Sequence, residues 1–119
     1  MAKTYDPTNI FARILRGEIP NKTLLETPHS LAFHDIRPLA PQHVLVIPRG
    51  PYVTWDHFAA QAGAEEIADF TRAVGRVAEL VGAGGYRLIS NAGPDGMQEV
   101  PHMHVHILAG RPLGPVLAH

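Results

Sequence analysis

The sequence contains no cysteine among its 119 residues. That absence excludes a thiol nucleophile, a disulfide framework and any zinc site built with thiolates. Serine is scarce as well, because only Ser30 and Ser90 occur and neither lies in the G-x-S-x-G turn of serine hydrolases. Nucleophilic catalysis by a thiol or by a serine of that kind is therefore not expected.

An excess of charge and long apolar runs are also lacking. Lys and Arg number 10 against 11 Asp and Glu, and the arginines are scattered, so no surface for a nucleic-acid backbone is predicted. No apolar run approaches the length of a membrane span, and the first residues lack the apolar core of a signal peptide. We expect a cytoplasmic protein that binds a small molecule, without nucleic-acid or membrane partners.

Length and patterning predict one domain of the α+β class. Residues 1–119 are taken as a single domain, with the Pro- and Gly-rich residues 110–119 as a C-terminal tail. A long helix is predicted over 64–81 from apolar residues three and four apart, and a short helix after Thr8 or Asn9. About five strands complete the antiparallel sheet, over residues 23–26, 30–34, 44–48, 86–91 and the histidine-rich segment that begins at 102.

That last segment, His102-Met103-His104-Val105-His106, is the most distinctive feature of the chain. In a strand, alternate side chains point to opposite faces, so the three imidazoles are predicted to share one surface while Met103 and Val105 pack inward. A neutral imidazole can act as a nucleophile, a base or a metal ligand near neutral pH. The segment therefore predicts a catalytic or binding site.

Two chemistries suit such a row. A metal ion is one, although His102 and His106 lie about 13 Å apart along a straight strand, whereas Zn–N bonds are ~2 Å long, so two of the histidines can share an ion more easily than three. Covalent catalysis at phosphorus is the other, with one imidazole attacking and its neighbours orienting it. The loop 91–98 can present N–H and amide donors to an anion. We favour this second chemistry, and expect no metal ion or other cofactor to be required.

The segment from His102 to Leu108 resembles the histidine-triad (HIT) signature, His-φ-His-φ-His-φ-φ with φ apolar. Further segments are similar to the Hint branch of this family, namely residues 10–20, 32–36, 40–48, 85–88 and 110–115. The resemblance implies a HIT-like fold and a homodimeric purine nucleoside phosphoramidase. Such enzymes cleave the P–N bond of adenosine 5′-phosphoramidates through a nucleotidyl-histidine intermediate.

Carried over by position, the resemblance makes His104 the nucleophile and His102 and His43 supporting imidazoles. The remaining matched positions would bind the nucleotide: His106, Asn91, Gln98 and Glu99 at the phosphate, Asp35 beside Ile36 at the ribose, Phe11, Ile14, Ile19 and Phe33 as apolar walls around the base, and Met97 and Val105 as further contacts. Periodicity alone instead predicts Phe11, Ile14 and Phe33 as ordinary core and Asp35 as a turn residue.

Two of these positions depart from the family pattern. Met97 stands where many members have a glycine whose backbone approaches the phosphate. Glu99 replaces a serine that is common in eukaryotic members, and it adds a carboxyl group near the point of leaving-group protonation. These departures concern the rate and the substrate range, whereas the class of reaction follows from the histidines.

Three alternatives share this pattern. Sister branches of the family hydrolyse dinucleoside polyphosphates or transfer nucleotidyl groups with the same imidazole chemistry. A protein that chiefly binds purine nucleotides as a regulatory or scaffold partner is a non-enzymatic alternative. A homodimer is expected in each case, because the edge strands of a small sheet and the helix over 64–81 offer surfaces for pairing.

Overall fold

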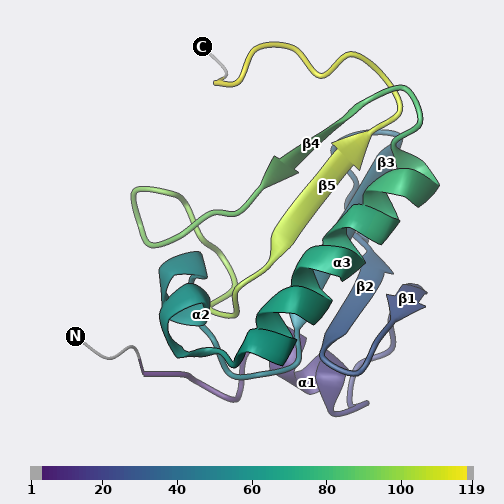
Figure 1. Ribbon diagram of the computed structural model, residues 1–119. Helices are drawn as coiled ribbons and strands as arrows, with labels where there is room; N and C mark the ends of the chain where they lie inside the picture. Colours follow the sequence, from purple (N-terminus) through teal and green to yellow (C-terminus); the bar gives the residue numbers. More distant parts are fainter. Residues whose placement is uncertain (1–3, 118–119) are drawn as a thin grey trace.

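A five-stranded antiparallel sheet with three helices forms the fold, in a computed structural model that describes residues 4–117 (Figure 1). The strands follow the spatial order β1-β2-β3-β5-β4. The elements along the chain are α1 (Ile10–Leu15), β1 (Thr23–Glu26), β2 (Ser30–His34), β3 (Gln42–Pro48), α2 (Trp55–Gln61), α3 (Ala64–Val81), β4 (Tyr86–Ile89) and β5 (Val105–Ala109). The α+β class and the antiparallel sheet predicted from the sequence are thereby confirmed.

The helices differ from the prediction in number. The bounds of α3 are those predicted, and Asn9 caps α1 by accepting a hydrogen bond from the Ala12 N–H at 2.9 Å. The sequence predicts one short helix, but α2 is a second one. It begins after Thr54, whose side chain accepts from the His57 N–H. With seven residues, it is too short for an apolar periodicity to reveal it.

The histidine strand starts later than predicted. We placed its start at His102, whereas β5 begins at Val105, which pairs with Val46 of β3. Continuing the ladder would bring the chain to Pro48, which has no N–H to donate. The Pro48 carbonyl instead accepts a hydrogen bond from the His102 ring. The predicted single surface of three imidazoles therefore does not form: His102 and His104 precede the strand.

One face of the sheet is covered by α3. Its buried Phe70 and Val77 belong to a core cluster with Val44, Val46 and Ile107 of the central strands. Alternate strand residues share a face, so Val44 and Val46 of β3 point toward this helix together with Val105 and Ile107 of β5. The stripe predicted for the long helix is therefore core.

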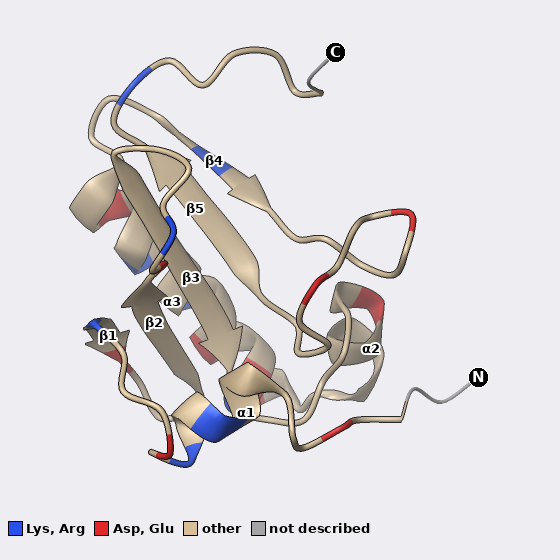
Figure 2. Ribbon diagram, turned by 180° about the vertical axis from the view of Figure 1, so that it is seen from behind, with Lys and Arg blue, Asp and Glu red and all other residues tan. Residues whose placement is uncertain are grey.

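On the face opposite α3 lies α1 (Figure 2), and a second, smaller core lies under it. Phe11 and Ile14 of this short helix pack with Leu31, Phe33 and Leu45 of the sheet. A six-residue helix spans about 9 Å, so it covers only part of this face. Side chains of β3 and β5 that face the same way remain available beside it.

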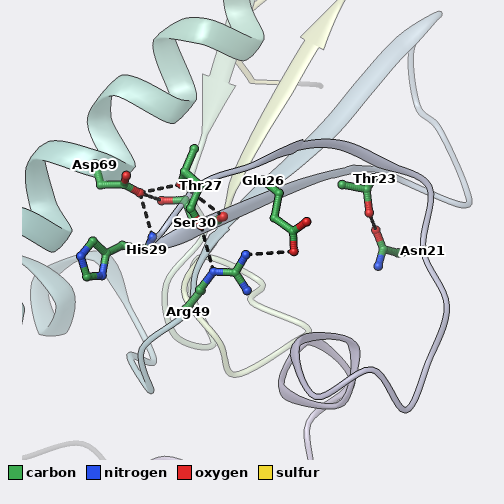
Figure 3. Close-up of polar contacts among 8 residues, drawn as sticks. All are labelled: Asn21, Thr23, Glu26, Thr27, His29, Ser30, Arg49 and Asp69. Atoms are coloured by element: carbon green, nitrogen blue, oxygen red, sulfur yellow. Dashed lines mark hydrogen bonds and ion pairs between the residues drawn. The ribbon is translucent and has the colours of Figure 1, made fainter.

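A partly buried carboxylate, that of Asp69, joins the β1–β2 turn to α3 (Figure 3). The Asp69 carboxylate accepts hydrogen bonds from the hydroxyls of Thr27 at 2.6 Å and Ser30 at 2.8 Å, and from the His29 N–H at 3.2 Å. Burial alone would raise the pKa of Asp69, but these donors hold it below its usual value. Three donors on one carboxylate fix the hairpin against the helix.

The edge of the sheet at β4 is apolar and uncovered. Tyr86 and Leu88 pair with Ala109 and Ile107, so they lie on the α3 face, yet they are 53% and 47% exposed. The helix packs over β1, β2, β3 and β5. Leu80 at the end of α3 is also half exposed. The strip of Tyr86 and Leu88 along β4 is a surface that a partner can bury.

The segment after β5 runs without helix or strand as far as the structure describes it. The Arg87 guanidinium donates to the Gly114 carbonyl at 2.7 Å, which ties this segment to β4. The predicted tail extends to residues 118–119, which lie outside the described residues. Among residues 4–117, no helix is both long and apolar enough to cross a membrane.

We predict a homodimer formed through the apolar strip at β4. Light scattering at micromolar concentration should give twice the 12.9 kDa mass of one chain. Leu88→Lys should shift the protein toward the monomer, because it places a charge in the buried interface. Leu39→Lys is the matched control, since Leu39 is 72% exposed on another surface and should leave the mass unchanged. A parent protein with the mass of a single chain would contradict the prediction.

Candidate active site

A pocket of about 590 Å³ opens beside α1, on the face of the sheet that α3 does not cover. Apolar side chains from α1 and the sheet form one part of it, and histidines and a carboxylate from β3, β5 and the β2–β3 connection form another. Pockets of this size suit small molecules and cofactors. An apolar wall next to convergent polar groups is the arrangement expected for a ligand with an aromatic part and an anionic part.

Most of the residues singled out in the sequence line this pocket. They are Phe11, Ile14, Ile19, Phe33, Asp35, Ile36, His43, Asn91, Met97, Glu99, His104 and His106. Three others do not. His102 is fully buried, and Val105 belongs to the core under α3. The Gln98 side chain hydrogen-bonds to the backbone and holds the loop between β4 and β5.

His104 combines burial with one free ring nitrogen. His104 is only 6% exposed, and its Nδ1 lies 2.6 Å from the His102 carbonyl oxygen. A carbonyl only accepts, so Nδ1 carries the proton and Nε2 keeps its lone pair. Burial lowers the pKa of His104, although Asp35 and Glu99 act in the opposite direction. A neutral imidazole with an unprotonated Nε2 can act as a nucleophile at neutral pH.

His43 and His106 form a hydrogen-bonded pair at the pocket. The Leu39 N–H donates to Nδ1 of His43 at 3.1 Å, so the His43 proton resides on Nε2. That nitrogen lies 2.9 Å from Nδ1 of His106 and 3.5 Å from the Asp35 carboxylate. His106 must then carry its proton on Nε2. Burial lowers the pKa of His43, and burial with the neighbouring His104 and His43 lowers that of His106 to about 4.

The side chain of Asp35 has two partners. One carboxylate oxygen accepts a hydrogen bond from the Arg37 N–H at 2.8 Å, which forms a turn, and the other faces His43. The interpretation of Asp35 as a turn residue and the interpretation as a pocket residue are therefore compatible. Only about four lone-pair sites exist on a carboxylate, and the turn uses one of them.

Three of these groups could also hold a metal ion. One ligand atom each from Asp35, His43 and His106 lie within 4.8 Å of one another. Imidazole nitrogen and carboxylate oxygen are ligands that zinc accepts, and neutral imidazoles need lose no proton to bind it. His102 and His104 do not belong to this cluster. The cluster therefore keeps metal binding open as an alternative to covalent chemistry.

The loop between β4 and β5 brings Met97 and Glu99 to the pocket. Gln98 closes this loop, since its side-chain amide donates to the Val53 carbonyl at 2.6 Å and accepts from the Gly93 N–H at 3.1 Å. Met97 adopts a left-handed backbone with φ of 58° and is 79% exposed. That conformation costs a residue with a side chain about 1–2 kcal/mol, which explains why glycine is suited to this position.

Sequence reasoning missed several groups that shape the site. The Leu39 N–H fixes the proton of His43, and a backbone donor leaves no trace in a sequence. Tyr5 contacts His102 across 97 positions of the chain, a separation that no local pattern spans. Ile10, which precedes the predicted Phe11 on α1, also lines the pocket. Its apolar side chain directly after the N-cap candidates Thr8 and Asn9 was the available signal, and the structure leaves it 43% exposed.

Known proteins and a protein family are similar to this chain over most of its length. The family described as HIT domain matches residues 16–113. An HIT-like protein of 13.2 kDa from Azospirillum brasilense is 63% identical over 98% of both chains. A purine nucleoside phosphoramidase from Escherichia coli K12 is 41% identical over 92% of this chain and 93% of its own. The solved structure of a HIT family hydrolase from Legionella pneumophila is 37% identical, covering 88% of this chain and 95% of its own, with a TM-score of 0.80.

Burial of the neutral imidazoles predicts a loss of stability in mild acid. The pKa of His102 is about 4 in the folded protein against an ordinary value of 6.5, so the unfolded chain binds more protons between these values. The stabilisation is complete above the ordinary value and is lost as the pH falls toward 4. We expect the free energy of unfolding to drop by about 2 kcal/mol from this residue between pH 7 and pH 5.

Denaturant unfolding at both pH values tests this expectation. His102→Gln retains an amide that can reach the Pro48 carbonyl but cannot titrate, so its free energy of unfolding should fall less on acidification. His106, whose pKa is lowered in the same way, should still contribute in the variant. An equal fall in the parent and in His102→Gln would exclude His102 as the source.

Proposed function

The chain belongs to the HIT domain family, and we propose that it hydrolyses the P–N bond of purine nucleoside 5′-phosphoramidates. One observation carries the proposal: His104 presents an unprotonated Nε2 at a pocket while its Nδ1 proton is held by the His102 carbonyl. The phosphoramidase among its relatives, at 41% identity, supports the P–N bond as the target. The proposed cellular site is the cytoplasm.

The first step is attack by the imidazole at phosphorus. Nε2 of His104 forms the P–N(His) bond as the bond between phosphorus and the substrate amine breaks, and the amine leaves with one added proton. The ring then carries a positive charge, which the His102 carbonyl oxygen opposite Nδ1 stabilises. Glu99, a neighbouring histidine or the substrate's own proton supplies the proton of the amine.

The second step releases the nucleotide. A water molecule attacks phosphorus, the bond to Nε2 of His104 breaks, and the nucleoside monophosphate leaves with the imidazole neutral again. The proton that the water loses goes to the group that protonated the amine in the first step, or to solvent. His106, with its proton on Nε2, is suited to donate a hydrogen bond to a phosphoryl oxygen. His43 keeps His106 in that tautomer by donating to its Nδ1. His102 and His43 thus act on the reaction through the two histidines nearest to phosphorus.

The pocket is also suited to bind the nucleoside. Phe11, Ile14, Ile19 and Phe33 present apolar surface of the kind that a purine ring contacts. The Asp35 carboxylate keeps lone pairs beyond its contacts with Arg37 and His43, and these are suited to accept hydrogen bonds from ribose hydroxyls. Asn91 and Met97 lie at the same pocket on the side of the loop. A purine nucleoside monophosphate is the ligand we propose for it.

Other substrates use the same groups. A dinucleoside polyphosphate or a nucleotidyl acceptor would form the same covalent intermediate at His104, and a binding protein would use the pocket without turnover. The cluster of Asp35, His43 and His106 favours metal-dependent chemistry as a second candidate. Rates measured side by side on adenosine 5′-phosphoramidate and diadenosine tetraphosphate, with and without a chelator, separate these possibilities.

We predict a covalent nucleotide adduct on His104. A quenched reaction with adenosine 5′-phosphoramidate should show one added AMP by intact-mass analysis, mapped to His104. His104→Ala should lower kcat by about 10³-fold or more and leave AMP affinity nearly unchanged, because only the attacking nitrogen is removed. His102→Ala should slow the reaction without abolishing the adduct, because it loosens the segment that orients the nucleophile.

The outcome with chelator is part of the same experiment. EDTA should leave the rate unchanged, since neither the attack by His104 nor the hydrolysis of the intermediate uses a metal ion. An adduct on another histidine would contradict the assignment of His104. Activity lost in EDTA and restored by zinc would replace the covalent mechanism with the metal-dependent one.

A second prediction concerns ribose recognition by Asp35. Asp35→Asn keeps an oxygen that accepts from the Arg37 N–H, so the turn should persist while the charge is lost. A charge-assisted hydrogen bond contributes about 1.5–3 kcal/mol, so calorimetry should show AMP binding weakened about tenfold or more. The parent should prefer AMP over 2′,3′-dideoxy-AMP, and the variant should lose that preference. If the variant binds AMP as tightly as the parent does, the role of Asp35 is confined to the turn.

A further inference from the structure

The His102 ring is held at both nitrogens although it does not reach the pocket. It is fully buried, and its Nε2 lies 2.7 Å from the Pro48 carbonyl oxygen. Because a carbonyl only accepts, Nε2 carries the proton and Nδ1 carries the lone pair. The Tyr5 hydroxyl lies 2.6 Å from Nδ1, so Tyr5 donates this second hydrogen bond. The two contacts together fix the tautomer of the ring and its orientation.

The backbone around His102 is held by contacts other than strand pairing, since the His102 N–H donates to the Val100 carbonyl at 2.8 Å and the Met103 N–H to the Tyr52 carbonyl at 2.7 Å. The β3–β5 ladder ends at Val105, so residues 102–104 make no ladder hydrogen bonds. Nevertheless, the His102 carbonyl is the group that accepts the Nδ1 proton of His104. The orientation of the His104 ring, and with it the position of Nε2, therefore depends on how rigidly His102 is held in place. A ring fixed at both nitrogens supplies an anchor at this residue.

We propose that Tyr5 is a positioning residue, whose hydroxyl fixes the His102 ring and thereby the carbonyl that orients the His104 imidazole. Its effect on rate rests on the proposed function of His104 as the nucleophile. Tyr5 lies in the N-terminal segment that leads into α1 (Figure 1). Phe11 of α1 meets the same two histidines edge-on, at ring-centroid distances of 6.2 Å and 4.9 Å. The N-terminal part of the chain thus contacts the histidines at two points.

The hydroxyl also affects the charge of His102. The groups packed against this ring are Tyr5 from the N-terminal segment, Phe11 from α1, Pro48 from β3 and His104 from its own segment. Of these, Tyr5 and His104 titrate, and burial favours the neutral form of both. A donor on Nδ1 stabilises neutral His102. A second positive charge beside the His104 imidazolium of the intermediate is thereby avoided.

Tyr5→Phe removes the donor and keeps the ring that packs against His102 at a centroid distance of 5.5 Å. We expect kcat to fall about tenfold while KM changes less than about twofold, because alignment is lost and binding is kept. The acid limb of the kcat/KM profile should move to higher pH, because neutral His102 loses a hydrogen bond. In ¹⁵N spectra, the His102 Nδ1 resonance should shift to that of an acceptor without a donor.

Tyr52→Phe is the matched control. It removes another partly buried tyrosine hydroxyl, which donates to Glu66 rather than to a histidine. This variant should leave the His102 resonances, the acid limb and kcat unchanged. If Tyr5→Phe also left all three unchanged, the proposal would be overturned. Equal changes in both variants would overturn it too, because they would indicate general loosening.

Two measurements on the parent keep the inference separate from the proposed function. The ¹⁵N spectrum must show His102 with its proton on Nε2, and a proton on Nδ1 would overturn the proposal even if Tyr5→Phe did not fold. A parent without turnover on any nucleotide would refute the proposed function. The shift of the His102 Nδ1 resonance in Tyr5→Phe would still decide whether Tyr5 holds the ring.

Discussion

The site depends on hydrogen bonds that fix where the protons of buried imidazoles reside. Pro48 and His102 each offer a carbonyl to a ring N–H, and Leu39 offers its backbone N–H to a ring nitrogen. Burial lowers the pKa of each of these rings, so they are neutral at neutral pH. The position of the single proton on each ring then decides which nitrogen keeps its lone pair. Only one tautomer of His104 leaves Nε2 free at the pocket. Without these backbone contacts, the ring protons of the same histidines would not be confined to one nitrogen.

The sheet provides those contacts because the β3–β5 pairing begins and ends at particular residues. The register pairs Leu45 with His106, so His43 lies diagonally across from His106 on the same face, where their side chains can meet. At the other end of β3, Pro48 cannot extend the ladder, and its carbonyl is left for His102. The histidines thus meet the backbone where regular pairing ends.

One group of side chains serves both the fold and the pocket. Phe11 and Phe33 belong to the core under α1 and also line the pocket, and the edge of the Phe11 ring meets His104. Periodicity correctly marked both as core, while the family resemblance marked them as walls for the base. The two interpretations agree physically, because a short helix covers only part of its face of the sheet, and the uncovered edge of a core is apolar surface open to a ligand.

The sequence by itself determined the class of the fold and the bounds of β1, β2 and α3, because apolar periodicity and turn residues are local signals. The sequence also predicted, through its resemblance to the HIT family, most of the residues that line the pocket. It did not determine the start of β5, the helix α2 or the proton positions on the histidines. Those depend on groups far apart in the chain, such as Pro48 beside His102 and Tyr5 beside the same ring. Local patterns carry no information about such contacts, so only the tertiary structure decided which imidazole nitrogen is left free.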